Sequence, residues 1–72
     1  MIGKTNNILQ LKNLSIGYDK PLAILEVEFT SGDIYRYFDV PENLFKQFLS
    51  APSHGQFLNR YISYNYRYQK KN

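Results

Sequence analysis

A period-two alternation of apolar residues is the feature that most constrains the fold of this chain. It occupies residues 22–30, where every second position from Leu25 to Phe29 is apolar, as in a strand that buries one face. A turn sequence, Ser31-Gly32-Asp33, follows, and a second strand-like run covers residues 34–40. The chain is therefore predicted to contain a β-hairpin.

The turn also fixes the register of this hairpin. A three-residue loop with Gly32 in the left-handed conformation joins the two runs without strain. The predicted pairs are Val27 with Tyr35, Leu25 with Tyr37 and Glu26 with Arg36. A shift by one residue would mix polar and apolar side chains on both faces, so the pattern and the turn favour the same register.

The elements on either side of the hairpin complete an α+β fold. Residues 8–18 are rich in apolar side chains and are predicted to form a first strand that ends near Tyr18. After the hairpin, Pro41 favours a helix start, and Pro52 ends that helix near Ala51. We therefore expect a three-stranded antiparallel meander followed by two helices.

The second helix has a clear start and an ambiguous end. Ser53-His54-Gly55-Gln56 is a capping box, with a Ser N-cap and a Gln three residues later. Beyond Tyr64 the spacing of the aromatic residues fits either a helix or an extended chain.

Aromatic side chains are expected to supply the extra burial that a small core needs. The chain has 72 residues, no Cys and a single His, so neither disulfides nor a metal is expected to support a small domain. It has seven Tyr and five Phe. The predicted core consists of Leu25, Val27, Phe29, Phe45, Phe48, Leu49, Phe57, Leu58, Tyr61 and Ile62. We expect one domain over residues 1–72, with residues 1–7 loose and residues 69–72 forming a basic tail.

The residues offer little for catalysis or cofactor binding. The only histidine, His54, lies between Ser53 and Gly55 at a helix start, where a capping segment is the simpler interpretation. No spacing of His and carboxylates indicates a metal site, and no glycine-rich phosphate loop is present. No apolar run approaches a membrane span. We expect a cytoplasmic protein without enzymatic activity, cofactor or metal, and without a membrane partner.

Charge is divided unevenly along the chain. Residues 1–42 carry a net charge of −2, whereas residues 43–72 contain five Lys or Arg and no acid, a net charge of +5. In the C-terminal part these cations alternate with tyrosines, a combination suited to single-stranded nucleic acid. The predicted contact residues are Arg60, Tyr64, Tyr66, Arg67, Tyr68, Lys70 and Lys71, with Tyr35, Tyr37 and Asn59 as secondary candidates.

Structural explanations compete with these assignments. Phe57, Tyr61, Tyr64 and Tyr68 also have the spacing of a core-facing stripe, and this explanation is favoured for Phe57 and Tyr61. The hairpin register favours core packing for Tyr35 and Tyr37 over base stacking. Asn59 either ties the helix to the sheet or presents its amide to a ligand, and the structural role is favoured.

Taken together, the residues from Leu14 to Tyr68 resemble the KTSC domain, a family named for the C-terminus of lysyl-tRNA synthetase. The matching positions are Val27, Phe29, Gly32, Tyr35, Tyr37, Val40, Pro41, Ala51, Ser53, Gly55, Asn59, Tyr66 and Tyr68, with Gly17-Tyr18-Asp19 at the end of the first strand. Two features depart from the family pattern: the Ser-Ser-x-Ile lead-in is missing, and Arg67 replaces a proline between two tyrosines.

The resemblance implies a binding module that occurs fused to the synthetase and as stand-alone bacterial or phage-like proteins, with RNA binding suggested. Our leading hypothesis is therefore a small nucleic-acid-binding module that prefers RNA to DNA. The alternative is a protein-interaction module, such as a phage or mobile-element protein that acts on a host factor.

Overall fold

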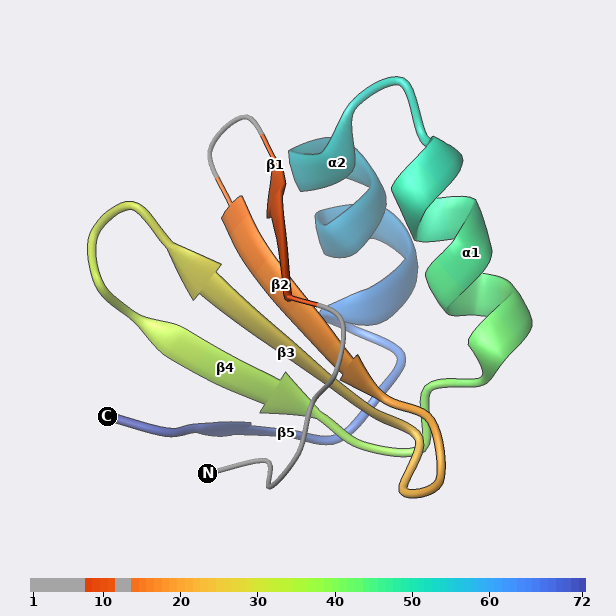
Figure 1. Ribbon diagram of the computed structural model, residues 1–72, viewed down its shortest axis with the longest axis horizontal. Coiled ribbons are helices and arrows are strands. Elements are labelled where there is room, and N and C mark those ends of the chain that lie inside the picture. Colours follow the sequence, from red (N-terminus) through yellow and green to blue (C-terminus); the bar gives the residue numbers. More distant parts are fainter. Residues whose placement is uncertain (1–7, 12–13) are drawn as a thin grey trace.

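A five-stranded antiparallel sheet with helices on one side forms the architecture of the chain (Figure 1). The computed structural model describes residues 8–11 and 14–72, with side chains from residue 14 onward. The strands follow the chain order across the sheet. They are β1 (Ile8–Leu11), β2 (Leu14–Asp19), β3 (Ile24–Phe29), β4 (Ile34–Tyr37) and β5 (Tyr68–Lys70). The helices are α1 (Glu42–Ser50), α2 (His54–Phe57) and a π-helix, η1 (Leu58–Ile62), which continues α2.

The prediction of a single strand over residues 8–18 is wrong, because this segment folds back on itself. β1 and β2 form an antiparallel pair in which Leu11 lies opposite Leu14. The sequence carries a signal for this reversal: the apolar alternation occupies odd positions up to Leu11 and even positions from Leu14 onward. Because side chains alternate between the faces of a strand, such a change of phase marks a break in the strand.

The β3–β4 hairpin and its predicted register are confirmed. Val27 pairs with Tyr35, Leu25 with Tyr37 and Glu26 with Arg36. Gly32 has a φ of 95°, and its backbone N–H donates to the Phe29 carbonyl at 2.9 Å. A positive φ is strained for residues with a Cβ, so glycine provides the conformation that the turn requires.

The C-terminal segment adds a further strand that was not predicted. η1 ends at Ile62, and the chain returns along β4 as β5, with Tyr68 opposite Tyr37 and Lys70 opposite Tyr35. Residues 69–72, which we expected to form a basic tail, continue this pairing. The Asn72 amide accepts a hydrogen bond from the Ile34 N–H at 3.0 Å and donates one to the Gly32 carbonyl at 2.7 Å. The sheet therefore has five strands instead of the three expected.

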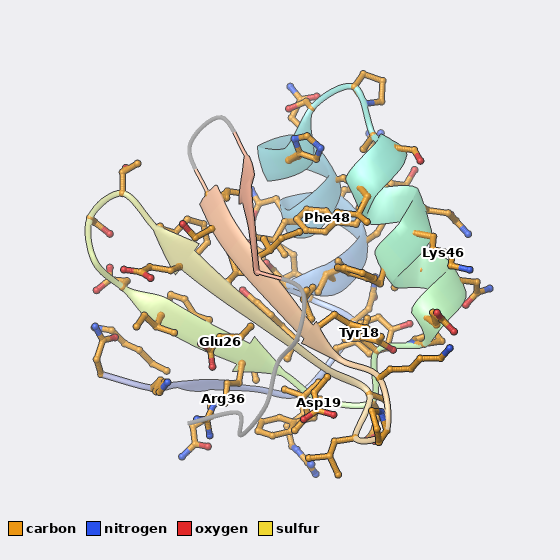
Figure 2. All side chains as sticks on the ribbon, viewed as in Figure 1. Tyr18, Asp19, Glu26, Arg36, Lys46 and Phe48 are labelled. Carbon is orange, nitrogen blue, oxygen red and sulfur yellow. The ribbon has the colours of Figure 1, made fainter. Side chains whose placement is uncertain are left out.

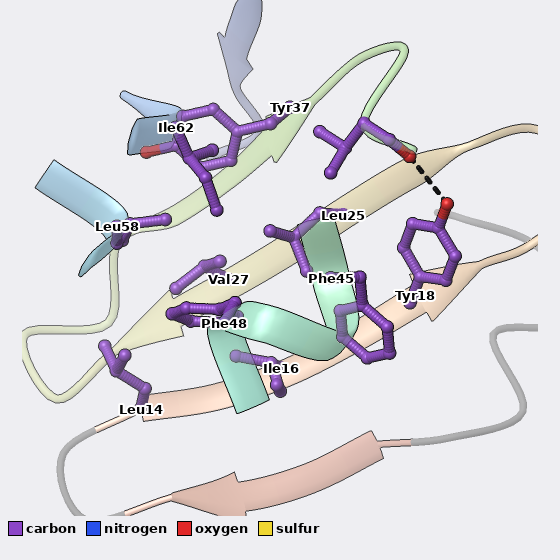
Figure 3. Packing of buried hydrophobic residues seen from close by; sticks show 11 residues of the cluster. Leu14, Ile16, Tyr18, Leu25, Val27, Tyr37, Phe45, Phe48, Leu58 and Ile62 are labelled. Carbon is purple, nitrogen blue, oxygen red and sulfur yellow. Dashed lines mark hydrogen bonds between the residues drawn. The ribbon is translucent and has the colours of Figure 1, made fainter. Parts of the chain in front are cut away.

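The core lies between the sheet and the helices, and Figure 3 shows its packing. Its buried members are Leu14, Ile16, Tyr18, Leu25, Val27, Tyr37, Val40, Phe45, Phe48, Leu58 and Ile62. Of the other predicted core residues, Phe29, Leu49 and Phe57 are half-buried against this cluster. Tyr61 is 46% exposed, so its assignment to the core is wrong.

The π-helix explains the position of Tyr61. The Ser63 N–H donates to the Leu58 carbonyl at 2.8 Å, an i→i+5 bond that inserts one more residue into the turn than an α-helix has. Leu58 and Ile62 both remain buried, and the three intervening residues, Asn59, Arg60 and Tyr61, are exposed. A single-turn distortion thus moves an aromatic ring from the expected core stripe to the surface.

Tyr18 connects the sheet, α1 and the preceding loop. Its ring stacks on Phe45 of α1 with the centroids 4.4 Å apart, and its hydroxyl donates to the Val40 carbonyl at 2.6 Å (Figure 3). Burial raises the pKa of the Tyr18 hydroxyl above the ordinary tyrosine value, because the phenolate would lose its hydration. The neutral form is therefore the one that this part of the fold stabilises.

Candidate nucleic-acid interface

The predicted contact residues fall into two regions of the structure. One is an open pocket of about 650 Å³ beside α2 and η1, which we call the helical pocket. It is lined by Ala51, Pro52, Ser53, Gln56, Phe57, Asn59, Arg60, Tyr61 and Tyr64. The other is β5 with the residues that flank it, Tyr66 to Asn72, which we call the C-terminal strand region. Arg60, Tyr64 and Asn59 belong to the first region, and the other five predicted C-terminal residues belong to the second.

Two tyrosine rings are available to a ligand at the helical pocket. Tyr64 is 83% exposed, the largest exposure among the large hydrophobic residues described. Tyr61 is half exposed, and its ring contacts that of Phe57 with the centroids 4.7 Å apart. Phe57 itself packs against the core residue Phe48 at 6.0 Å. Phe57 therefore supports the Tyr61 ring, and most of the Tyr64 ring faces solvent.

Arg60 supplies positive charge at this pocket. Within residues 14–72 its side chain forms no ion pair, hydrogen bond or ring contact, and no carboxylate lines the pocket. An arginine without an acidic partner retains all its donors for an anion. The pocket therefore combines an available cation with two aromatic rings.

The chain positions these groups through a helix start and a π-turn. Ser53 caps α2, because its hydroxyl accepts a hydrogen bond from the Gln56 N–H at 3.3 Å. η1 then directs Asn59, Arg60 and Tyr61 outward, and the Asn65 amide donates to the Tyr61 carbonyl at 3.0 Å. π-helical turns occur frequently at functional sites.

Tyrosines of the C-terminal strand region pack mainly against other parts of the protein. The Tyr68 ring lies 5.8 Å from Tyr35 and 5.9 Å from Tyr37, and Tyr66 is half-buried against the core. Tyr37 is buried, with its hydroxyl 3.5 Å from the Ser63 hydroxyl. Burial raises the pKa of the Tyr37 hydroxyl, and the contact with Ser63 partly opposes this shift. Core packing is thus the role of Tyr37, and Tyr68 extends that aromatic cluster toward the surface.

Cations of the C-terminal strand region are paired with neighbours. Lys70 Nζ lies 3.4 Å from Asp33 Oδ1, and Lys71 Nζ lies 3.6 Å from Glu26 Oε1. Arg67 places its guanidinium 4.9 Å from the centre of the Phe38 ring. Because Lys70 and Lys71 are adjacent along an extended chain, they point to opposite faces of the sheet. These two lysines therefore do not form a shared electropositive surface.

The Lys71 contact belongs to a small charge network on the sheet. Arg36 Nε also lies 3.3 Å from Glu26 Oε1, so one carboxylate oxygen serves two cations. Figure 2 shows Glu26 and Arg36 next to each other on β3 and β4. Glu26 thus pairs Lys71 with the sheet, although these three charged groups together keep one net positive charge.

Sequence reasoning missed two residues of the helical pocket. Tyr61 was assigned to the core, and Gln56 was considered only as a helix-capping residue. For Gln56, the presence of a polar amide on the same helix face as Arg60, four residues later, could have served as a signal. For Tyr61, no sequence signal distinguishes a π-turn from a regular helix.

His54 has a structural contact that accounts for its place at the start of α2. Its Nε2 lies 3.1 Å from the Leu49 carbonyl oxygen, and its ring meets Phe48 edge-on at 5.7 Å. Within the part of the chain that the structure describes, no group of three or more His, Cys, Asp or Glu residues is arranged to hold a metal ion. His54 thus links the beginning of α2 to the end of α1.

Comparison with known proteins identifies the family of this fold. A family model of the KTSC domain matches residues 12–66, which include all of α1, α2 and η1. The chain belongs to the KTSC domain family. A crystal structure of a KTSC domain protein from Yersinia pestis superposes with a TM-score of 0.80 at 31% identity, covering 92% of this chain and 94% of that one.

Relatives of this KTSC chain include both small proteins and parts of large ones. A protein of Stutzerimonas stutzeri is 46% identical over 55 residues, which are 75% of this chain and 78% of that protein. The lysine–tRNA ligase of Nostoc punctiforme is 34% identical over 53 residues, which are 74% of this chain and 9% of the ligase. The KTSC domain therefore occurs both as most of a small protein and as a minor part of an enzyme.

The helices described here are short. None of those within residues 14–72 has the length and apolar character needed to cross a lipid bilayer.

Proposed function

We propose that this KTSC protein is a binding module for single-stranded RNA and that the helical pocket is its contact site. The observation that carries the proposal is Arg60, whose side chain has no partner within residues 14–72, beside the exposed ring of Tyr64. Proteins that bind single strands combine cations for the phosphates with aromatic rings on which bases stack. The helical pocket offers both.

Each group has a distinct role in this proposal. Tyr64 stacks on an unpaired base, and Tyr61, supported by Phe57, provides a second apolar surface. Arg60 binds a phosphate next to that base, because the paired N–H donors of its guanidinium match phosphate geometry. RNA is favoured over DNA because a relative that shares this domain is a lysine–tRNA ligase.

Lys70 and Lys71 are left out of the proposed contact set. Each already contacts a carboxylate, Lys70 that of Asp33 and Lys71 that of Glu26, so a phosphate would compete with an ion pair that Arg60 lacks. Arg67 is a weaker candidate than Arg60, since its guanidinium already lies over Phe38. We therefore propose that the contact site comprises the helical pocket and excludes the C-terminal strand region.

Fluorescence anisotropy with a short labelled single-stranded RNA tests this proposal. We expect Arg60→Gln to weaken binding and to reduce the slope of log affinity against log salt by about one. The matched control is Lys46→Gln, which removes one charge from the exposed outer side of α1 (Figure 2) and should leave affinity nearly unchanged. If the two variants lost RNA affinity equally, binding would depend only on the net charge of the protein. That result would contradict a binding site at Arg60.

The rival function, a protein-interaction module such as a phage or mobile-element protein acting on a host factor, makes a different prediction in the same experiment. Phosphate contacts release counterions, so RNA binding must weaken between about 50 and 200 mM salt. A chain that binds no RNA at the lower salt concentration, but retains a single protein partner in a pull-down that Tyr64→Ala abolishes, would favour the rival.

A further inference from the structure

The two edges of the sheet differ in charge. β5 forms one edge, and it carries Lys70, with Arg67 directly before the strand and Lys71 directly after it. Lysines on an edge strand are one of the devices that prevent a sheet from pairing with another chain. The other edge is β1, Ile8–Leu11, which contains no charged residue, no proline and no glycine. The sequence of β1 therefore lacks the protection that β5 has.

The hydrogen-bond pattern of the sheet shows which backbone groups of β1 face outward. In an antiparallel sheet the backbone groups of successive residues point alternately to the two neighbouring strands. The Phe29 N–H donates to the Asp33 carbonyl, so the odd-numbered residues of β3 face β4 and the even-numbered ones face β2. When this alternation is followed through the registers of β2 with β3 and of β1 with β2, Leu9 faces β2. The N–H and C=O groups of Ile8 and Gln10 are then directed to the outer edge, where no further strand lies among the described residues.

A second copy of the chain fits this edge with two-fold symmetry. Two β1 strands can run antiparallel with Leu9 opposite Leu9 of the second copy, which sets Ile8 of each strand opposite Gln10 of the other. Because Ile8 and Gln10 are the residues whose backbone groups face outward, both of these pairs can exchange their N–H and C=O hydrogen bonds. Opposite residues share a face of the sheet, so the helices of the two copies lie on the same side of the joined sheet.

The same arrangement at β5 is opposed by charge. With Gln69 opposite Gln69 of a second copy, Arg67 would lie opposite Lys71 of that copy on both sides of the symmetry axis. Like charges directly opposite each other destabilise a strand pair. At β1 no such pair arises, because Ile8–Leu11 carries no charge. Charge therefore favours β1 over β5 for contact between copies.

We propose that the outer edge of β1 is a docking site for a second copy of this chain, and that two copies pair through β1 into one continuous antiparallel sheet. Dimers with two-fold symmetry are the commonest oligomers, because one self-complementary surface is sufficient to form them. None of the residues that line the helical pocket belongs to β1. The inference thus goes beyond the proposed RNA binding and does not depend on it.

Light scattering after size-exclusion chromatography measures this pairing. We expect the mass to rise with protein concentration from the 8.5 kDa of one chain toward twice that value, since an interface between two short strands is small and weak. Gln10→Lys adds a charge to the edge, and Gln10→Pro removes an outward N–H without removing a bond to β2, so both variants should lose the dimer. The matched control is Gln69→Lys, which adds the same charge to β5 and should keep the wild-type mass.

Disulfide formation tests the register. The chain has no Cys, so Leu9→Cys introduces a single thiol, which the proposed pairing places opposite its copy. Leu9 and its copy form a pair without backbone hydrogen bonds, whose Cα atoms lie about 4.5 Å apart, within the roughly 4.4–6.8 Å that disulfides span. With oxidised glutathione as the oxidant, we expect Leu9→Cys to form a covalent dimer at least about tenfold faster than Gln69→Cys, because pairing raises the effective concentration of the second thiol.

Salt distinguishes this pairing from RNA binding. The net charge of +3 makes two copies repel each other, so added salt should raise the dimer fraction, whereas it should weaken RNA binding.

Three results would overturn the inference. One is a wild-type chain that stays monomeric at every concentration and salt level. Another is a dimer that persists in both Gln10→Lys and Gln10→Pro, which would show that the copies pair through another surface. The third is equal rates of covalent dimer formation in Leu9→Cys and Gln69→Cys. None of these results affects the RNA-binding proposal, and a chain that dimerises without binding RNA would contradict that proposal alone.

Discussion

The helical pocket and the C-terminal strand region have similar sequences but different surroundings. Both contain tyrosines, side-chain amides and at least one cation, and neither contains an acid. At the pocket, Arg60 is unpaired within the described part of the chain and Tyr64 is exposed. In the strand region, Lys70 and Lys71 are held by carboxylates, and Tyr68 packs on other tyrosine rings. Composition alone cannot distinguish a binding surface from a packed strand.

Sheet topology is the origin of this difference. β5 lies beside β4, so its lysines meet acids from the β3–β4 hairpin that lie more than thirty residues earlier in the chain. η1 lies on the side of the molecule formed by the helices, and no acid among the described residues lines the pocket there. Whether a cation is available for binding therefore depends on which distant residues the fold brings next to it.

The largest effect on folding stability is expected at a core residue that lies beneath the helical pocket. Phe48 is fully buried, and its ring contacts His54 and Phe57 beneath the helical pocket. We expect Phe48→Ala to lower the free energy of unfolding by about 3–5 kcal/mol, since it leaves a cavity in a small core. Urea denaturation would measure the loss. The neighbouring exposed Gln47→Ala should change it by less than about 0.5 kcal/mol. If the C-terminal strand region stayed folded at urea concentrations that unfold the helical pocket, the two regions would be independent folding units.

Substituting one tyrosine in each region sharpens the comparison. We expect Tyr64→Ala to reduce the binding free energy for single-stranded RNA by about 1–3 kcal/mol, through the loss of one stacked base. Stability should be nearly unchanged, since this ring is mostly exposed. Tyr68→Ala should do the reverse: it should lower the free energy of unfolding, as the contacts with Tyr35 and Tyr37 are worth about 0.5–1.5 kcal/mol each. Anisotropy would measure RNA binding, and thermal unfolding would measure stability, for both variants. A loss of RNA binding in Tyr68→Ala, or a loss of stability in Tyr64→Ala, would contradict the comparison.

The smallest expected effect is a decrease in folding stability at alkaline pH. An unfolded tyrosine loses its proton near pH 10, whereas burial keeps Tyr18 and Tyr37 protonated to higher pH in the folded chain. Above about pH 10 the folded state thus binds more protons than the unfolded state. Stability is therefore fully present below that pH and falls as the pH rises through the raised pKa values. Urea denaturation at several pH values above about 10 would measure the free energy of unfolding. This free energy should fall less steeply with pH in Tyr37→Phe than in the wild-type chain. An unchanged slope of stability against pH would show that burial of Tyr37 does not control this titration.

Local sequence signals determined which parts of the fold could be predicted. The β3–β4 register followed from Gly32 and from the alternation of neighbouring residues, and the structure confirms it. The division of residues 8–18 into β1 and β2 was missed, although the change of phase after Leu11 indicated it. β5 could not be predicted, because its pairing with β4 depends on the path of the intervening helices.

The candidate site was predicted only in part, for a similar reason. Arg60, Tyr64 and Asn59 follow from the pattern of cations, rings and amides on the helix, and all three line the helical pocket. The position of Tyr61 depends on the i→i+5 hydrogen bonding of η1, for which the sequence gives no signal. The carboxylates that pair with Lys70 and Lys71 belong to the β3–β4 hairpin, far from these lysines in the sequence.

Chemical-shift mapping tests most directly the central claim that the pocket, and not the C-terminal strand, contacts RNA. The experiment titrates the ¹⁵N-labelled chain with an unlabelled single-stranded RNA and follows each backbone amide. The account predicts shifts that concentrate between residues 53 and 64, while the amides of β5 and Lys71 stay in place. Shifts concentrated on β5 and Lys71, with Gln56, Arg60 and Tyr64 unmoved, would contradict it.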